Sequence, residues 1–217
     1  EPRLLVTNRI SLALPDLPFA LKNLKILHFS DLHWNGQFSR SFQKKIISRI
    51  NALAPDFILF TGDFICRSKL EDPDGLRAFL NSLHAPAGCY AVLGNHDYAD
   101  FVTVNANGDY DVEEASTTST IAKGFKRLFR SVPLTKQVTE KAQQLPKHDE
   151  LIRLLEQTPF QLLNNTSKLV AYNGHWINIC GLGEYSLGRS LPAKAFAHYQ
   201  AGYPGIILSH NPDAIEN

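Results

Sequence analysis

The chain of 217 residues contains no methionine, only three cysteines and almost no net charge. A formal net charge of +1 argues against the basic excess of nucleic-acid-binding domains and gives no sign of an acidic partner. The sequence lacks any apolar run approaching the ~20 residues of a membrane-spanning helix, and it lacks a recognisable signal peptide. We therefore expect a folded domain that does not bind nucleic acid and has no membrane span within these residues.

The cysteines form no Cys-x-x-Cys pair, and their odd number argues against a framework of disulfides. Cys89 and Cys180 stand in apolar runs, where a free thiol behaves as a small hydrophobic side chain. All three, Cys66 included, are predicted to be reduced and inert, as in a protein that faces the cytosol. Because the chain begins at Glu1 and has no methionine, we expect a longer gene product, in which an N-terminal membrane anchor could precede these residues.

The residues that are present, 44% hydrophobic and 20% charged, predict one globular domain over 1–217. Apolar residues recur at helical spacing in Ser39–Leu53 and Asp72–Leu83. Apolar runs that predict buried strands stand at Lys25–Ser30, Asp56–Thr61, Gly88–Leu93 and Gly205–Leu208. Strand–helix–strand units of about 30 residues require parallel pairing through right-handed crossovers. The chain is therefore predicted to have an α/β fold with a parallel sheet.

Three further segments show weaker patterns. The first 24 residues are typical of an edge strand followed by a proline-marked turn. The dipeptide Asn173-Gly174 predicts a hairpin between strands at Leu169–Ala171 and Trp176–Leu182. A last helix is expected over Pro192–Gln200.

Short loops rich in metal-binding side chains follow the four predicted buried strands. They are Asp31-Leu32-His33, Gly62-Asp63, Gly94-Asn95-His96-Asp97 and Ser209-His210-Asn211-Pro212. Taken singly, an Asp-x-His or a Gly-Asp is more often an ordinary turn. Since ligands bind outside the carboxyl ends of strands in α/β sheets, the four loops should converge on one place. Their carboxylate, amide and imidazole groups suit hard or borderline divalent cations, so together they predict a dinuclear metal site.

The order of the residues suggests how each side chain would act. Asp31 and His33 alternate along the chain, so on an extended segment both would point to one side and grip one cation. Asp63 follows a glycine, and its two oxygens could bridge metals about 3.5–4 Å apart. Asn95 offers a neutral amide oxygen, and His210 offers another imidazole.

These motifs together resemble the calcineurin-like metallophosphoesterases, over most of the chain from about Leu24 onwards. The resemblance implies a β-sandwich flanked by helices, with two divalent metals, often Mn²⁺, at the strand ends. By position, the metal ligands would be Asp31, His33, Asp63, Asn95 and His210, with Asp63 as the bridge. His96 would be the general acid or the phosphate contact. Asp97 would position His96 by accepting its ring N–H, as carboxylates behind a ligand do.

One part of the family pattern is missing from this chain. The family closes its site with a Gly-His-x-His loop, in which each histidine completes one metal. The only other Gly-His pair, Gly174-His175, is followed by Trp176 and no second histidine. The missing loop would follow His210 by a strand and a turn, so we expect truncation at the C-terminus rather than a true loss of metal binding.

From about 101 to 159 the alternation of strands and helices breaks, which predicts an insertion that forms a lid near the active-site edge. Within it, Ile121–Lys136 has apolar residues at helical spacing and basic residues mostly off that face. Such a helix either contacts a lipid or membrane surface or packs its apolar face on the domain. A polar helix near Asp149–Gln157 closes the insertion. The candidate substrate- or membrane-binding residues are Phe125, Lys126, Arg127, Leu128, Phe129 and Arg130.

Two cations could polarise a phosphoryl group and activate a water for in-line attack, and a protonated His96 could donate to the leaving oxygen. Within the family, the opening around Leu17-Pro18-Phe19-Ala20 resembles a membrane-anchored bacterial branch. The insertion is similar to that of enzymes that hydrolyse UDP-2,3-diacylglucosamine to UMP and 2,3-diacylglucosamine 1-phosphate in lipid A biosynthesis. This resemblance implies a nucleotide-linked lipid as substrate and a place on the cytoplasmic side of the inner membrane.

Two alternatives stay open: a phosphodiesterase or phosphatase with a soluble substrate, and a non-enzymatic scaffold on a degenerate metallophosphoesterase fold. Arg67 and Glu184 stand on loops near the motifs, where surface residues without a role are the simpler interpretation.

Overall fold

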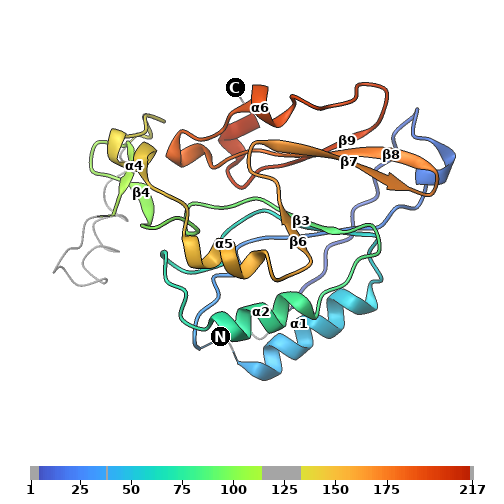
Figure 1. Ribbon diagram of the computed structural model, residues 1–217, viewed down its shortest axis with the longest axis horizontal. Coiled ribbons are helices and arrows are strands. Elements are labelled where there is room, and N and C mark those ends of the chain that lie inside the picture. The colour runs from blue at the N-terminus through green and yellow to red at the C-terminus, as the bar shows by residue number, and fades with distance from the viewer. Residues whose placement is uncertain (1–4, 38, 114–132, 216–217) are drawn as a thin grey trace.

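A parallel four-stranded sheet forms the middle of the computed structural model, which describes residues 5–37, 39–113 and 133–215 (Figure 1). Its strands, in spatial order, are β1 (Ile26–Phe29), β2 (Phe57–Phe60), β3 (Cys89–Ala91) and β6 (Phe160–Leu162). All three pairings are parallel. The mixed α/β class is therefore confirmed, although the short strand β6 was not predicted.

A second, three-stranded sheet lies on one face of the first (Figure 1). Its strands, in spatial order, are β7 (Thr166–Tyr172), β8 (His175–Gly181) and β9 (Gly205–Leu208). The antiparallel hairpin of β7 and β8 turns at Asn173 (φ 47°) and Gly174 (φ 77°). A type I′ turn requires positive φ at both central residues, so the predicted hairpin is confirmed.

Strand β2 takes part in the hydrophobic core on both of its faces, and all four of its residues are buried. Phe57 and Leu59 pack in the core that includes Ile179 of β8. Ile58 and Phe60 pack in the core that includes the helices. A strand covered on both faces is apolar at every position, which explains why this run shows no alternation.

Helices α1 (Arg40–Ala52), α2 (Pro73–Asn81) and α5 (Asp149–Leu155) cover the other face of the parallel sheet (Figure 1). Helix α2 begins at Asp72, whose side chain accepts a hydrogen bond from the N–H of Gly75 at 3.0 Å. Helix α5 was predicted to be polar, but three of its leucines are buried, namely Leu151, Leu154 and Leu155. The predicted helices at Ser39–Leu53 and Asp72–Leu83 are confirmed within two residues.

Two expectations about the ends of the chain are wrong. Residues 5–14 form no strand, and Ile10 and Leu12 are exposed rather than packed on a sheet. The segment Pro192–Gln200 forms only the one-turn helix α6 (Pro192–Ala195). Further along, the Asn178 side chain accepts from the N–H of Gln200 at 2.9 Å and donates to the C=O of Gln200 at 3.0 Å. These bonds hold a turn.

The expected insertion contains a β-hairpin and a short helix in its described parts. These elements are β4 (Val102–Val104), β5 (Tyr110–Val112) and α4 (Glu140–Gln144). The predicted basic helix, with all of its candidate substrate-binding residues, falls mainly on 114–132, outside the described residues. The 3-10 turns η1 (Phe19–Leu21), η2 (Tyr185–Leu187) and η3 (Pro212–Ile215) complete the elements. Among the described helices, none is long and apolar enough to cross a bilayer.

Leu80 of α2 and Lys44 of α1 offer a matched test of the helix-covered core, since Leu80 is fully buried and Lys44 is exposed. Leu80→Ala should lower the free energy of unfolding by about 2–5 kcal/mol, because it leaves a cavity. Lys44→Ala should change it by less than about 0.5 kcal/mol. Urea denaturation followed by circular dichroism measures both, and equal effects would contradict the described packing.

Candidate metal centre

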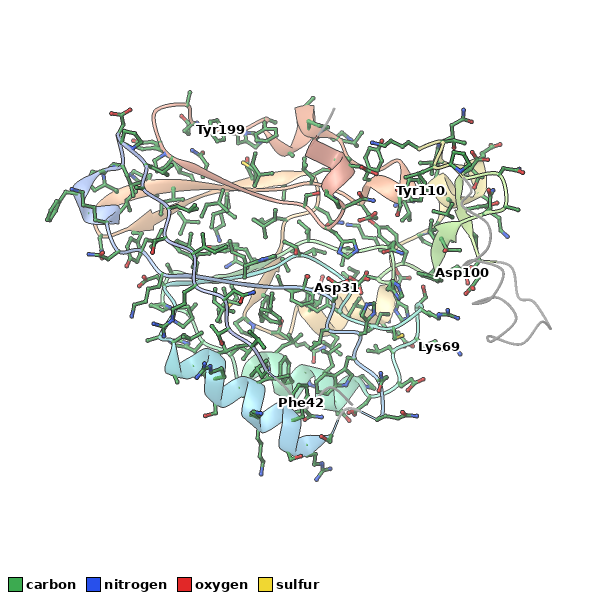
Figure 2. The ribbon with its side chains drawn as sticks, turned by 180° about the vertical axis from the view of Figure 1, so that it is seen from behind. Asp31, Phe42, Lys69, Asp100, Tyr110 and Tyr199 are labelled. Carbon is green, nitrogen blue, oxygen red and sulfur yellow. The ribbon has the colours of Figure 1, made fainter. Side chains whose placement is uncertain are left out.

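The four motif loops converge on one place, as the sequence predicts, with Asp63 at their centre. Three of them follow β1, β2 and β3 at the carboxyl edge of the parallel sheet, and the loop with His210 follows β9 of the second sheet. The Oδ2 atom of Asp63 lies 3.6 Å from His33 Nε2 and 3.7 Å from His96 Nε2. Its Oδ1 atom lies 3.6 Å from His210 Nε2. Asp31 Oδ1 lies 3.7 Å from the same nitrogen of His33. Figure 2 shows Asp31 between the helices and the second sheet.

The expectation that Asp31-Leu32-His33 is extended is wrong. Asp31, His33 and Asp63 have φ angles of 54°, 44° and 62°, which are rare for residues other than glycine. The N–H groups of Asp31 and His33 donate to the carbonyls of Gly62 and Asp63, both at 3.0 Å. These bonds extend the β1–β2 pairing into the loops. Residues in such conformations cost about 1–3 kcal/mol each and cluster at functional sites. A kink, and not strand alternation, brings Asp31 and His33 together.

Asn95 and His210 form the other side of the cluster. Asn95 Nδ2 donates to the C=O of Val102 at 2.8 Å, so its Oδ1 faces His210 Nε2 at 3.2 Å. His210 Nδ1 lies 2.7 Å from the C=O of Thr61. A carbonyl can only accept, so Nδ1 carries a proton, and Nε2 of the neutral ring has a lone pair. That lone pair faces oxygens of Asn95 and Asp63. Because three electron-rich atoms face one another, a cation between them would be stabilising.

The electrostatic surroundings of His210 favour positive charge. Burial alone would lower the pKa of His210, but the charges of Asp63 and Glu184 raise it overall. The neutral donors and the carboxylate are therefore arranged around a centre that favours positive charge.

Asp97 does not accept the ring N–H of His96, and that expectation is wrong. It is completely buried, and its Oδ2 accepts from the N–H groups of Asp63 at 2.8 Å and Gly94 at 3.0 Å. Its Oδ1 accepts from the N–H of Ile65 at 3.2 Å. Burial, and then the charge of Asp63, raise the pKa of Asp97 to about 7. Asp97 thus ties the loop after β3 to the loop after β2.

The ring of His96 is held by a backbone group instead. The N–H of Arg67 donates to His96 Nδ1 at 2.8 Å. Burial, and then the neighbouring charge of His33, lower the pKa of His96 to about 4, so the ring is neutral at pH 7. Because Nδ1 accepts, the single proton lies on Nε2, which faces Asp63. His96 therefore offers a neutral N–H donor to the centre, rather than the protonated ring expected from sequence.

The donor set fits divalent cations that share Asp63. Imidazole nitrogens and carboxylate oxygens bind such ions at about 2.0–2.2 Å, which places two ligands of one ion roughly 3–3.5 Å apart. The candidate ligand atoms of Asp31, His33 and Asp63 all lie within 4.8 Å of one another. The shortest of these separations, 3.6 and 3.7 Å, are close to that size, so the group of Asp31, His33 and Asp63 fits a divalent ion.

Cys66 is a member of the cluster that the sequence did not indicate. Possible ligand atoms of Cys66, His33 and His96 all lie within 4.8 Å of one another. Its place in the loop that carries Asp63 was the available signal. All three cysteines are free, and burial raises the pKa of the Cys89 thiol to about 11, consistent with an inert role for that residue.

The two loop residues near the motifs differ from each other. Glu184 is 1% exposed, and its Oε1 accepts from Ser186 Oγ at 2.7 Å, so its interpretation as a surface residue is wrong. Arg67 lies at the rim of the centre. Its Nη1 lies 3.5 Å from Glu113 Oε2, and its guanidinium lies 5.6 Å from the centre of the Phe101 ring. That ring in turn packs on His96, with ring centres 4.2 Å apart.

The buried acidic centre gathers imidazole and amide donors that suit divalent metal ions. The family model of the calcineurin-like phosphoesterases matches residues 24–214, and the chain belongs to that family.

Relatives with curated names agree with this family. The chain is 41% identical over its full length to the UDP-2,3-diacylglucosamine pyrophosphatase LpxG of Chlamydia trachomatis, of which the match covers 66%. It is 39% identical over 99% of its length to the LpxG of Chlamydia muridarum, of which the match covers 65%. The uncharacterized metallophosphoesterase YkoQ of Bacillus subtilis is 28% identical over 96% of the chain and 60% of its own length. The chain thus spans just under two thirds of the two chlamydial proteins.

Asp63 makes the stability of the metal-free protein depend on pH. Burial raises the pKa of Asp63 to about 6 from 3.8, although the charges of His210 and His33 oppose the shift. Between about pH 4 and pH 6 the folded state therefore binds more protons than the unfolded state, so this contribution to stability is lost as the pH rises. Asp63→Asn removes this contribution. The free energy of unfolding of the variant should therefore fall less than that of the wild type between about pH 4 and pH 6.

Urea denaturation of chelator-treated wild type and Asp63→Asn between pH 4 and pH 8 measures the difference. Added Mn²⁺ should restore stability above pH 6 in the wild type only, because the ionised carboxylate binds the ion. Parallel pH profiles of the two proteins would contradict the position of Asp63 at the buried centre.

Proposed function

We propose that the chain is the catalytic domain of a dinuclear-metal phosphohydrolase that cleaves UDP-2,3-diacylglucosamine to UMP and 2,3-diacylglucosamine 1-phosphate. Water adds to one phosphorus of the diphosphate, and the bridging P–O bond breaks. The observation that carries this proposal is the 41% identity, over the whole chain, to a protein named UDP-2,3-diacylglucosamine pyrophosphatase. The imidazoles gathered around Asp63 support it. The reaction would belong to lipid A biosynthesis, on the cytoplasmic side of the inner membrane.

Each side chain has one role in this proposal. Asp31 and His33 would hold the first metal, Asn95 and His210 would hold the second, and Asp63 would be shared between them. Two divalent ions, Mn²⁺ in our proposal, supply Lewis acidity toward the phosphoryl oxygens and lower the pKa of a bound water. His33 Nε2 lies 3.6 Å from Asp63 Oδ2 and His210 Nε2 lies 3.6 Å from Asp63 Oδ1, and this separation onto the two oxygens supports the division.

His96 acts on the substrate and not on a metal. With its proton on Nε2, it donates a hydrogen bond to a phosphoryl oxygen, where negative charge grows during hydrolysis. The Arg67 N–H holds the tautomer that makes this possible. Asp97 acts as a positioning residue, because it fixes the backbone of Asp63 and Gly94. A displacement of either loop would move ligands of both metals.

The segment 101–159 is proposed as an insertion that contacts the nucleotide-linked lipid within the single domain 1–217. Phe125, Leu128 and Phe129 would meet acyl chains, and Lys126, Arg127 and Arg130 would meet phosphate or anionic lipid head groups. The charge pattern of the sequence supports this part.

The scaffold alternative is disfavoured by electrostatics. Asp63 and Asp97 are both buried, and burial raises the pKa of each carboxyl group. The charge of Asp63 raises the pKa of Asp97 further. A fold without metal would hold these carboxyl groups at a cost, whereas bound cations offset it. A soluble phosphodiester remains the competing substrate class, and the experiment below includes it.

Hydrolysis by the full-length gene product with Mn²⁺ tests the proposal, with UDP-2,3-diacylglucosamine and bis-p-nitrophenyl phosphate as substrates. The lipid substrate should be preferred. Asp63→Ala should lower its turnover by more than about 100-fold, since even residues behind metal ligands cost about 10–100-fold. Asp16→Ala, at an exposed position, is the matched control and should leave turnover unchanged. Hydrolysis of the soluble diester alone would reject the lipid substrate, and activity on neither would reject the enzyme.

A further inference from the structure

A pocket of about 280 Å³ lies beside Asn95 and His210, which are proposed to hold the second metal. Asn95 and His210 form its inner end, and β4 forms one wall. The aromatic residues Phe101 and Tyr110 also line it, together with the polar residues Thr103, Ser186 and Asn211. The proposed metal ligands therefore lie next to a cavity that the metals themselves do not need.

One backbone edge of strand β4 is not paired with another strand, and it faces the part of the centre formed by Asn95 and His210. Within the described parts of the chain, β4 pairs with β5 alone. The Phe101 C=O accepts from the N–H of Glu113, and the Asn105 N–H donates to the C=O of Asp109. In an antiparallel ladder the residues that bond to the partner strand alternate with residues whose groups point away. Val102 and Val104, which fall between, therefore direct N–H and C=O away from β5.

The direction of this edge is established by Asn95. The Val102 C=O accepts from Asn95 Nδ2 at 2.8 Å, so the edge faces the metal centre and the pocket. Val104 lies two residues further along, roughly 7 Å from Val102 at about 3.4 Å per residue. A nucleotide whose phosphate lies at the metals would reach Val104 with its base.

We propose that this pocket binds the uracil ring of the substrate, with the N–H and C=O of Val104 pairing with a carbonyl oxygen and the N3–H of the base. This inference rests on the proposed function, which supplies the uridine. An edge residue of a strand presents a donor and an acceptor side by side, as strands do when they bind an added chain. Uracil presents an acceptor beside a donor on its Watson–Crick edge and matches this pair.

The size and lining of the pocket favour a base over acyl chains. Its volume lies just below the range of roughly 300–1,000 Å³ for drug-sized ligands, so one small ring fits and two long chains do not. The polar side chains of Thr103, Ser186 and Asn211 in its lining suit a polar ring better than an acyl chain. The acyl chains are thereby assigned to another part of the protein.

Binding of the product UMP to the Mn²⁺-loaded full-length protein, measured by calorimetry, tests the pocket. Val104→Pro removes the N–H at an outward-facing edge position, where proline is tolerated, and Val104→Ala keeps it. UMP should bind Val104→Pro about tenfold more weakly than Val104→Ala, as expected for the loss of one or two hydrogen bonds. Inorganic phosphate, which has no base, should bind both variants equally and so reports an intact centre.

The ligand can be changed as well as the protein. 3-Methyluridine 5′-monophosphate lacks the N3–H and should bind the wild type about tenfold more weakly than UMP. Equal binding of the two nucleotides, or of UMP to the two variants, would overturn the pocket assignment. If UDP-2,3-diacylglucosamine is still hydrolysed in that case, the pocket fails and the proposed function stands. Base-selective binding without hydrolysis would support the pocket and reject the proposed reaction.

Discussion

The buried negative charge of Asp63 is the constraint on which the rest of the site depends. Its carboxylate is almost fully removed from water, and the imidazoles of His33, His96 and His210 all lie within 3.7 Å of it. A carboxylate in such a position stays ionised only when positive charge is close to it. Protons can supply that charge in part, but the lone pair of His210 and the oxygen of Asn95 face the same space. The arrangement of these side chains therefore suits a divalent cation.

The scaffold supplies rigidity where this charge is concentrated. Strand β2, buried on both faces, ends directly at Gly62 and Asp63. Asp97 then bonds to the backbone on both sides of the centre, which fixes the distance between two loops that come from different strands. The kinked residues Asp31 and His33 add local strain to this region. The packed core and the hydrogen bonds to Asp97 offset that strain. They also hold the proposed ligands in position before a metal binds.

The convergence of the motif loops could be predicted from sequence, because ligands bind outside the carboxyl ends of strands in α/β folds. Bonding within the site could not. Asp97 was expected beside His96, yet the nearest donors to its carboxylate are backbone N–H groups that no sequence pattern reveals. The tautomer of His96 likewise depends on a backbone group, the N–H of Arg67, that the sequence does not reveal. Apolar runs predicted β2 well, but the edge strand expected within the first 24 residues does not form over 5–14, where Ile10 and Leu12 are exposed.

Anomalous X-ray scattering from Mn²⁺-soaked crystals of the protein tests the central claim most directly, because it locates the ions rather than their effects. Two anomalous peaks about 3.5–4 Å apart, one on each side of the Asp63 carboxylate, are the predicted result. One peak should contact Asp31 and His33, and the other should contact Asn95 and His210. The absence of any peak at Asp63, with the metal bound elsewhere or not at all, would contradict a dinuclear centre built by these loops.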